Sequence, residues 1–341
     1  MLMEICKECF GDCELRTQVE AISIHDSHVC SICGKNSTEH CDLSEFNEFF
    51  HSLLILFQKT SDGKPLTNLI QEDWGIFSSL DIGHKILSEV LQTMPDLDLQ
   101  ADSSVEYIDD VTVLVKNWEE LKLRIKEQTR FMVDNDDLDV FNFLESSNEL
   151  HIGDVLYRAR ILHSPDDMYD VEHMGCPAKG NATAGRANPV GIPYLYLSKD
   201  SETTYYEVRA TYLDYLAVGT FNVCRDLNIV DFHPKIDIYN AYNEGDGALT
   251  SIVARKKAIE AISKDLSRPM RRFDSEVEYV PTQLICEYCK VALNADGICF
   301  ESSLHRGHDN VGLTRQSPWH RLAKISTIHG RKSRKMLTFA A

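Results

Sequence analysis

The stretch of the chain that decides the fold is Gly185-Arg-Ala-Asn-Pro-Val-Gly-Ile-Pro-Tyr-Leu-Tyr-Leu-Ser198. Its first part, 185–193, is rich in glycine and proline and predicts a loop whose backbone can approach a ligand closely. Its second part, 194–198, is a short apolar and aromatic run that predicts a buried strand. Arg186 lies in this loop between Gly185 and Gly191 and is therefore a candidate ligand-binding residue.

The sequence on either side of this stretch alternates between strand and helix patterns. Residues 155–162 alternate in the manner of a strand, and 163–193 contain many Gly, Pro, Asn and Asp residues and predict a loop. After the stretch we expect a helix over 201–215 and strands over 215–222 and 228–232. This part of the chain is predicted to be a mixed α+β domain.

The N-terminal 42 residues are crowded with cysteine. Six of the 11 cysteines lie there, and four of them form the pairs Cys6-x-x-Cys9 and Cys30-x-x-Cys33. Two such pairs complete a tetrahedral Zn²⁺ site with four thiolates and no open position, so we expect a structural zinc. Other thiols and imidazoles could replace a member of the set: Cys13, Cys41, His25, His28 and His40. Free reduced thiols without metal are the alternative.

Residues 43–145 are predicted to be a helical region, with apolar residues at helical spacing in 43–57 and 113–133 and a loop over 92–102. The charge is uneven along the chain. The whole sequence has 35 basic and 53 acidic residues, a formal net charge of −18, yet residues 72–150 hold 19 acids and only 6 bases. The last 21 residues hold six bases and no acid. We expect this tail to be solvated and partly disordered.

Composition also excludes several functional classes. No apolar run approaches the ~18 residues that span a bilayer, and the N-terminus lacks a signal-peptide pattern. We therefore expect a cytoplasmic protein without a membrane partner. The strong acidity argues against free nucleic acid as the main partner.

Charged residues set among apolar ones mark a candidate site. Arg158 lies inside an apolar strand, where a guanidinium needs a carboxylate or phosphate partner. Glu207 lies on the predicted helix between Tyr206 and Val208. An Arg and a Glu can also form a purely structural ion pair, and this alternative stays open on these residues alone.

The ordered set of motifs resembles the RES family of bacterial toxins. The motifs are Tyr157-Arg158, the loop 185–193, Tyr196-Leu-Ser198, Glu207 on a helix, and Gly297-Ile-Cys-Phe-Glu-Ser-Ser303. The cysteine module and helical region resemble, more loosely, an N-terminal domain that precedes RES and HEPN effectors. Two departures stand out: Phe300 replaces a common Tyr, and polar residues after Ser303 replace an expected apolar strand.

The resemblance implies a fold similar to ADP-ribosyltransferases and an enzyme that consumes NAD. Glu207 would stabilise the positive charge that develops on the ribose when the nicotinamide bond breaks. Arg158 and Arg186 would hold the pyrophosphate, together with Asn188 in the same loop. Tyr196 would stack on a ring of NAD, and Ser303, in preference to Ser302, would hydrogen-bond the substrate.

The predicted organisation is a four-cysteine zinc-ribbon-like module (1–42), an acidic helical region (43–145), a RES catalytic domain (146–315) and a basic tail (316–341). The leading hypothesis is a toxin or defence effector that cleaves the nicotinamide–ribose bond of NAD by hydrolysis or phosphorolysis, restrained by an antitoxin protein. Two alternatives stay open: an ADP-ribosyltransferase with a protein target, and a non-catalytic nucleotide-binding adaptor. A homo-oligomer also stays open.

A HEPN-type ribonuclease is disfavoured. Arg158 and His163 match its loose R-x4-H motif, but they lie on a predicted strand and loop instead of a helix. Cys286 and Cys289 lie on a predicted helix without a second pair nearby, so we expect ordinary thiols there.

Overall fold

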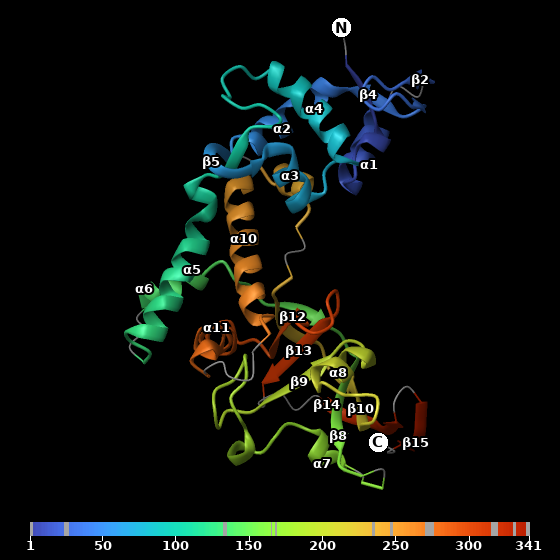
Figure 1. Cartoon of the computed structure of the whole chain (residues 1–341), viewed down its shortest axis with the longest axis vertical. Coiled ribbons are helices and arrows are strands. Elements are labelled where there is room, and N and C mark those ends of the chain that lie inside the picture. The colour runs from blue at the N-terminus through green and yellow to red at the C-terminus, as the bar shows by residue number, and fades with distance from the viewer. Residues whose placement is uncertain are drawn as a thin grey trace. The chain divides into compact units, whose positions relative to one another are not determined.

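The structure is a computed structural model of the whole chain (Figure 1). It describes residues 3–23, 27–131, 135–164, 166–167, 169–233, 236–245, 248–269, 276–314, 320–329 and 332–338. His25, one of the spare zinc ligands, lies outside these residues. In the described part, no helix combines the length and apolarity that crossing a lipid bilayer requires.

The chain divides into two compact units. The first contains 1–114 and 235–257, and the second contains 115–234 and 258–341. The boundaries fall inside two helices, α5 (Asp109–Glu127) and α10 (Ala248–Leu266). The segment 235–257 thus belongs to the first unit although it lies far along the chain. The four-part division expected from the sequence stays a prediction.

The N-terminal part of the first unit is built from short strands and one helix. Strand β1 (Glu4–Cys6) pairs antiparallel with β4 (His40–Asp42), and β2 (His28–Val29) pairs with β3 (Asn36–Ser37). Helix α1 (Cys13–Ile22) begins after Asp12, whose carboxylate accepts the backbone N–H of Leu15 and caps the first turn.

The rest of the first unit is helical with one strand pair. Its helices are α2 (Asn47–Leu54), α3 (Leu66–Trp74), α4 (Leu80–Gln92) and α9 (Ile238–Asn243). Strands β5 (Phe57–Pro65) and β6 (Ser104–Tyr107) pair antiparallel inside the region predicted to be helical, so that prediction is wrong there. Six of the nine β5 residues are polar or charged, and this polarity hid the strand from hydropathy patterning.

The second unit is organised around one mixed sheet (Figure 1). In the described residues its strand order is β15-β14-β10-β8-β9-β13-β12-β11-β7. All neighbours are antiparallel except β11 and β12. The strands are β7 (Ser147–Leu150), β8 (Val155–Leu162), β9 (Tyr194–Ser198), β10 (Tyr215–Val223), β11 (Leu227–Asp231), β12 (Gly297–Glu301), β13 (Asp309–Thr314), β14 (His320–His329) and β15 (Lys332–Thr338).

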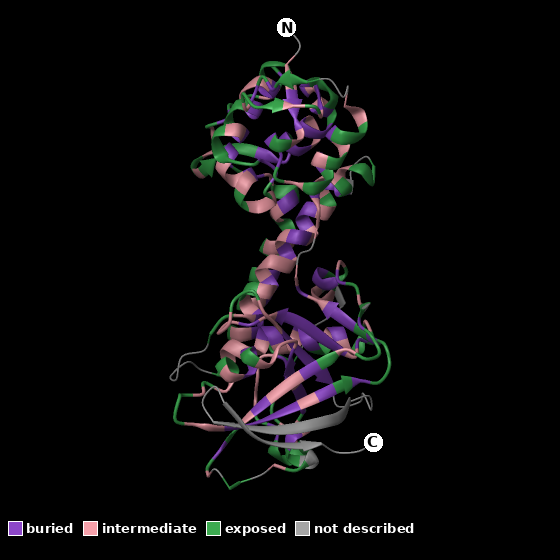
Figure 2. Ribbon diagram, turned by 90° about the vertical axis from the view of Figure 1, so that its right-hand side faces the viewer, coloured by how far each residue is buried: buried purple, intermediate pink, exposed green. Residues whose placement is uncertain are grey.

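Consecutive residues of β9, β12 and β13 are buried, so both faces of the sheet are covered there. Figure 2 draws strands of the second unit largely as buried. On β12, Ile298 and Phe300 join a core cluster with α5, α10 and α11 (Val280–Val291), whereas Cys299 joins a cluster on the other face. Helix α11 packs on β12. The mixed α+β class predicted for this domain is therefore confirmed. The remaining helices are α6 (Asn135–Leu138), α7 (Val171–Met174) and α8 (Ser201–Glu207).

The strands predicted over 155–162, 194–198, 215–222 and 228–232 are confirmed within a residue or so. Two expectations about the C-terminal part are wrong. A strand, β13, does follow the late serines, and it supplies five consecutive buried residues. The basic tail does not fit the expectation of a solvated, partly disordered end either, because its backbone forms β14, which pairs with β10, and β15, which pairs with β14.

Candidate functional site

Helix α8 positions the candidate catalytic carboxylate. It begins after Asp200, whose side chain accepts the backbone N–H groups of Glu202 and Thr203. It ends soon after Glu207, earlier than the sequence predicted, because Arg209 adopts a left-handed φ of 52°. The Arg209 and Ala210 N–H groups then bond carbonyls of the last turn, which is the Schellman arrangement that terminates helices. Glu207 is therefore the last helical residue of α8.

The Glu207 carboxylate is held by two strands that lie side by side in the sheet. Its Oε1 accepts hydrogen bonds from Ser302 Oγ at 2.6 Å and from Asn310 Nδ2 at 2.7 Å. Asn310 is itself fixed, because its Oδ1 accepts the Ser198 hydroxyl at 2.7 Å. Ser198, Ser302 and Asn310 are all buried. This network ties the predicted Glu to β9, β13 and the end of β12.

The structure brings Ser302, and not Ser303, to the carboxylate. Ser302 also accepts the backbone N–H groups of Leu304 and His305, so its hydroxyl is oriented toward Glu207. Ser303 is half-buried and lines a separate hollow. The hydrogen bonds that Ser302 makes explain the choice, because they fix its hydroxyl at Glu207.

A cleft of about 220 Å³ opens beside Glu207. Residues from four segments of the chain line the cleft. Three of these residues, Arg158, Tyr196 and Glu207, were predicted as site residues. Thr204 and Asn310 add polar groups. The cleft thus places a carboxylate, a guanidinium and a phenol around one space.

Arg158 lies on β8 at the edge of this cleft. Its Nη1 donates to the backbone carbonyls of Met174 at 3.1 Å and Gly175 at 2.5 Å. No salt bridge joins it to a carboxylate among the residues that the structure describes, so the purely structural pair with Glu207 is absent there. Burial lowers the pKa of Arg158 to about 10, and the nearby Arg160 adds to the effect. Arg158 nevertheless stays cationic at neutral pH.

Arg186 lies in the loop 185–193. Its Nη1 donates to the carbonyl of Asp265 at 3.0 Å, and its guanidinium lies over the Tyr279 ring at 5.9 Å from the ring centre. Burial lowers its pKa, whereas Tyr279 and Glu207 raise it electrostatically. Arg186 does not line the cleft that contains Arg158.

Asn188 and Tyr196 shape the same loop. Asn188 is buried; its amide donates to the carbonyls of Thr183 and Pro189, and its Oδ1 accepts the Tyr196 hydroxyl at 2.7 Å. The Tyr196 oxygen also accepts the N–H of Ala187. Burial raises the pKa of the Tyr196 phenol. Asn188 is thus occupied in holding the loop, while the Tyr196 ring still borders the cleft.

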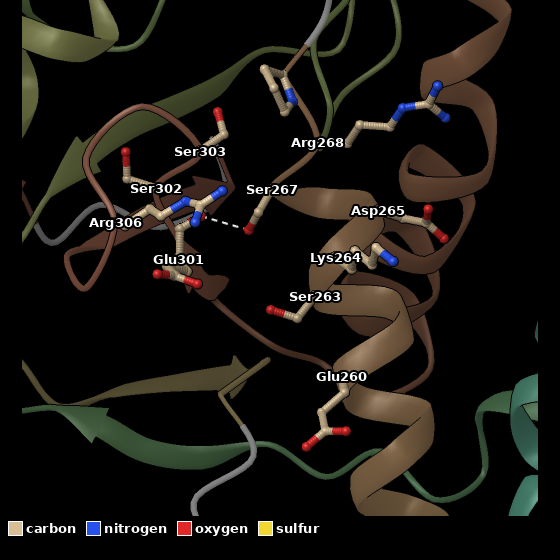
Figure 3. A pocket seen from close by; sticks show the side chains of 11 residues that line it. Glu260, Ser263, Lys264, Asp265, Ser267, Arg268, Glu301, Ser302, Ser303 and Arg306 are labelled. Carbon is tan, nitrogen blue, oxygen red and sulfur yellow. Dashed lines mark hydrogen bonds between the residues drawn. The ribbon is translucent and has the colours of Figure 1, made fainter. Parts of the chain in front are cut away.

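A larger hollow of about 700 Å³ lies between the end of α10 and the loop after β12 (Figure 3). Lys264 and Arg268 come from the helix side, and Ser302, Ser303 and Arg306 from the loop side. The hydroxyl of Ser267 donates to the Glu301 carbonyl at 2.7 Å and connects the two sides. Because Ser302 borders this hollow and bonds Glu207, the hollow adjoins the carboxylate network.

Comparison with known proteins identifies the fold family. A family model described as the RES domain matches residues 155–331, which is more than half of the chain. The chain belongs to the RES family. The match covers every strand from β8 to β14 and contains Arg158, Arg186, Glu207 and Ser302.

A solved structure, the M. tuberculosis MbcT–MbcA toxin–antitoxin complex, matches at 13% sequence identity with a TM-score of 0.32. The match covers 66% of this chain and 91% of that chain. No curated protein matches the chain. The family assignment therefore depends on the domain match alone.

The RES domain contains functional candidates that sequence patterns missed. Asn310 lies in a segment that we described only as polar, and Ser302 ranked below Ser303. The signal for Asn310 was present: in Asp309-Asn-Val-Gly-Leu an amide occupies a strand position among apolar residues, where it must find a hydrogen-bond partner.

A network of charged side chains connects residues at the ends of β9, β11 and β13 in the RES domain. His233 Nδ1 contacts Asp231 Oδ1 at 2.5 Å, and Nε2 lies 3.0 Å from Asp309 Oδ1. Asp309 also pairs with Lys199 at 2.8 Å. The hydrogen bond to Asp231, with the Asp309 carboxylate beside the other ring nitrogen, raises the pKa of His233 to about 11. The His233 ring beside Asp309 holds the pKa of that carboxyl well below its usual range. An imidazolium between two carboxylates thus connects β11 to β13.

The four predicted zinc ligands converge in the first unit. The Sγ atoms of Cys6, Cys9, Cys30 and Cys33 lie within 4.8 Å of one another. The Sγ–Sγ distances are 3.8 Å for Cys6–Cys9 and 3.5 Å for both Cys6–Cys33 and Cys9–Cys30. A tetrahedron of sulfurs at ~2.3 Å from Zn²⁺ has edges of about 3.8 Å. The cluster can therefore hold a metal ion. Cys13 is exposed and outside it, and Cys286 and Cys289 are buried in the helical core.

Proposed function

We propose that the chain consumes NAD by breaking its nicotinamide–ribose bond, with water or inorganic phosphate as acceptor. The observation that carries the proposal is the Glu207 carboxylate at the cleft, held by Ser302 and Asn310 and faced by Arg158 and Tyr196. These groups come from segments as far apart in the sequence as Arg158 and Asn310, in a domain of the RES family, whose members consume NAD.

The chemistry assigns a role to each group. When the C–N bond breaks, its electron pair leaves with nicotinamide, and positive charge develops on the ribose. A fixed carboxylate beside that carbon stabilises the charge, and Glu207 takes this role. The hydrogen bonds from Ser302 and Asn310 both end on Glu207 Oε1 and orient the carboxylate before substrate arrives. The acceptor oxygen then attacks the ribose and loses its proton to solvent.

The cations have a different task. NAD carries an anionic pyrophosphate, and a guanidinium matches its oxygens in a bidentate manner. Arg158 borders the cleft and takes the pyrophosphate in this proposal, whereas Arg186 lies further along the loop and extends the positive potential. Ser303 is assigned to the larger hollow, where it can meet the acceptor or the distal part of NAD.

The direct test is release of nicotinamide from NAD by the purified full chain. Glu207→Gln is expected to lower the rate by at least about 100-fold, because the charge is lost and the shape is kept. Glu202→Gln, on the same helix but away from this cleft, is the matched control and is expected to stay within about twofold. Equal rates in wild type and Glu207→Gln would remove Glu207 from the chemistry.

The acceptor is read from the products. A rate that depends on inorganic phosphate, with a phosphorylated ADP-ribose product, identifies phosphorolysis, and free ADP-ribose identifies hydrolysis. Label from NAD that stays on a protein band in lysate identifies ADP-ribosyl transfer instead. NAD binding without nicotinamide release identifies a nucleotide-binding adaptor and contradicts the enzyme.

The same proposal includes a toxic activity restrained by an antitoxin protein, and an ADP-ribosyltransferase-like sheet. Expression of the wild-type chain alone in bacteria is expected to stop growth and deplete NAD, while Glu207→Gln is tolerated. In the first unit we propose a structural Zn²⁺ on the cysteine cluster, in a ribbon-like module. Four thiolates close the shell and leave no position for chemistry.

A further inference from the structure

Three further ligand groups lie close to the cysteine cluster in the first unit. A carboxylate oxygen of Glu4 and ring nitrogens of His28 and His40 lie within 4.8 Å of one another. We infer that Glu4, His28 and His40 form a second metal site, for Zn²⁺ or a transition ion of similar size. Two imidazoles and one carboxylate are a ligand set that binds such ions and leaves a position open to water.

The buried histidine is the first argument. His40 is 2% exposed, and its Nδ1 has no hydrogen-bond partner among the described residues. Its Nε2 lies 3.8 Å from Glu4 Oε2, which is too far for a hydrogen bond. A buried ring nitrogen without a hydrogen-bond partner is costly, so His40 Nδ1 favours a ligand at this ring. A bound cation would take one ring nitrogen and draw the Glu4 carboxylate to coordination distance.

The orientation of the rings is the second argument. The His28 and His40 rings have centres 5.2 Å apart and planes tilted by 50°. A nitrogen lone pair lies in the plane of its ring, so tilted rings can direct two lone pairs at one ion. The RES domain offers a contrast in His305 and His308, whose rings stack at 3.8 Å with a tilt of only 5°. Parallel stacked rings direct their lone pairs along separate lines.

The strand register is the third argument. On β1, Glu4 lies two residues before Cys6, and His28 lies two residues before Cys30. In extended chain a spacing of two places side chains on the same face. His40 is the direct partner of Cys6 across the β1–β4 ladder. Each Cys-x-x-Cys pair thus gives two thiolates to the cysteine cluster, and the residue two positions before its first cysteine, Glu4 or His28, belongs to the neighbouring site.

Electrostatics favours this arrangement once the cysteine cluster is loaded. Zn²⁺ with four thiolates carries a net negative charge, which attracts a second cation nearby. His28 is exposed and Glu4 is half-buried, so the second site opens to solvent on one side. The second ion is therefore expected to exchange faster than the enclosed one.

The test measures metal binding by the full chain, purified without a histidine tag. Wild type is expected to contain about two equivalents of zinc, and treatment with a mild chelator is expected to remove one of them. In His28→Ala and in Glu4→Gln the labile equivalent is expected to bind at least about 100-fold more weakly. His84→Ala changes an exposed histidine on α4 and is the control, with unchanged binding expected.

Cobalt separates the two sites, because only a thiolate site shows sulfur-to-cobalt charge-transfer absorption. If wild type binds cobalt without a gain in charge-transfer intensity, and His28→Ala does not, the result supports the second site. Binding that saturates at the thiolate site alone, or a labile ion retained in both variants, overturns it. A failed nicotinamide assay would leave this result unaffected, since the site lies in the other unit.

Discussion

Replacing His233 by Gln provides a quantitative test of the charge network in the RES domain. The imidazole lies 2.5 Å from Asp231 and 3.0 Å from Asp309, and it is only 19% exposed. Gln cannot carry the proton, so both carboxylates lose the imidazolium, while Asp309 keeps its ion pair with Lys199. Breaking a buried pair by removing one partner costs about 3–5 kcal/mol. The partial exposure of this network lowers our expectation to about 2–4 kcal/mol at pH 6.

The pH dependence follows from the raised pKa of His233. The folded value is about 11 and the ordinary value is 6.5, so the imidazolium stabilises the fold fully below pH 6.5. As the pH rises from 6.5 toward 11, the unfolded chain loses this proton and the folded chain keeps it, and the stabilisation declines. The stabilising free energy can decline by at most about 1.4 kcal/mol per pH unit. Cys299 and Lys199 face the same network, but the Gln variant retains both.

The assay is urea unfolding of wild type and His233→Gln at intervals between pH 6 and 9. The difference in free energy of unfolding is expected to shrink by about 2–3 kcal/mol across that range. His151→Gln, which changes a 66%-exposed histidine beside Asp226, is the control and should show no such trend. A difference that stays constant with pH, or an NMR titration of His233 with a midpoint near 6.5, would refute the reasoning.

Three more outcomes are expected. Ser302→Ala removes the 2.6 Å hydrogen bond to Glu207 and should lower the rate of nicotinamide release by about 10- to 100-fold. Ser303→Ala should lower this rate less, and the reverse order would contradict the assigned geometry. Cys9→Ser should abolish binding of the tightly held zinc, measured by metal analysis, and lower the melting temperature of the first unit, measured by calorimetry. If the variant retains this zinc, Cys9 is not a ligand. Phe232→Ala leaves a cavity at a fully buried position beside the sheet and should lower the free energy of unfolding, measured with urea, by about 3–5 kcal/mol. A decrease below about 1 kcal/mol would mean that neighbouring side chains fill the cavity.

The parts of the fold that could be predicted were those in which local pattern and burial agree. Residues 155–162 and 194–198 are apolar runs bounded by turn residues, and both form strands. Strand β5 escaped prediction because its side chains are mostly polar and its partner, β6, is remote in sequence. Nothing local in residues 235–257 shows that they pack with the first unit, because that depends on contacts across more than 100 residues.

In the candidate site, too, sequence patterns predicted some residues and not others. Motif spacing identified Glu207 and Arg158, and both border the cleft. Neither the choice between Ser302 and Ser303 nor the part played by Asn310 could be predicted, because each depends on the register between β12 and β13. Spacing also could not show that the Asn188 amide makes hydrogen bonds within its own loop, and the ligand-binding role expected for it stays a prediction.

The order of strands in the RES sheet has a consequence for how the domain folds. Strand β10 pairs with β8 on one side and with β14 on the other, and Tyr215 faces both Leu162 and His329. Closing such distant pairs costs chain entropy before any contact is gained, so this unit should fold on a scale of milliseconds to seconds. Until β14 arrives, one edge of β10 exposes its unpaired N–H and C=O groups and can pair with another chain. Refolding yield should therefore fall as protein concentration rises, and a chain truncated before residue 320 should aggregate.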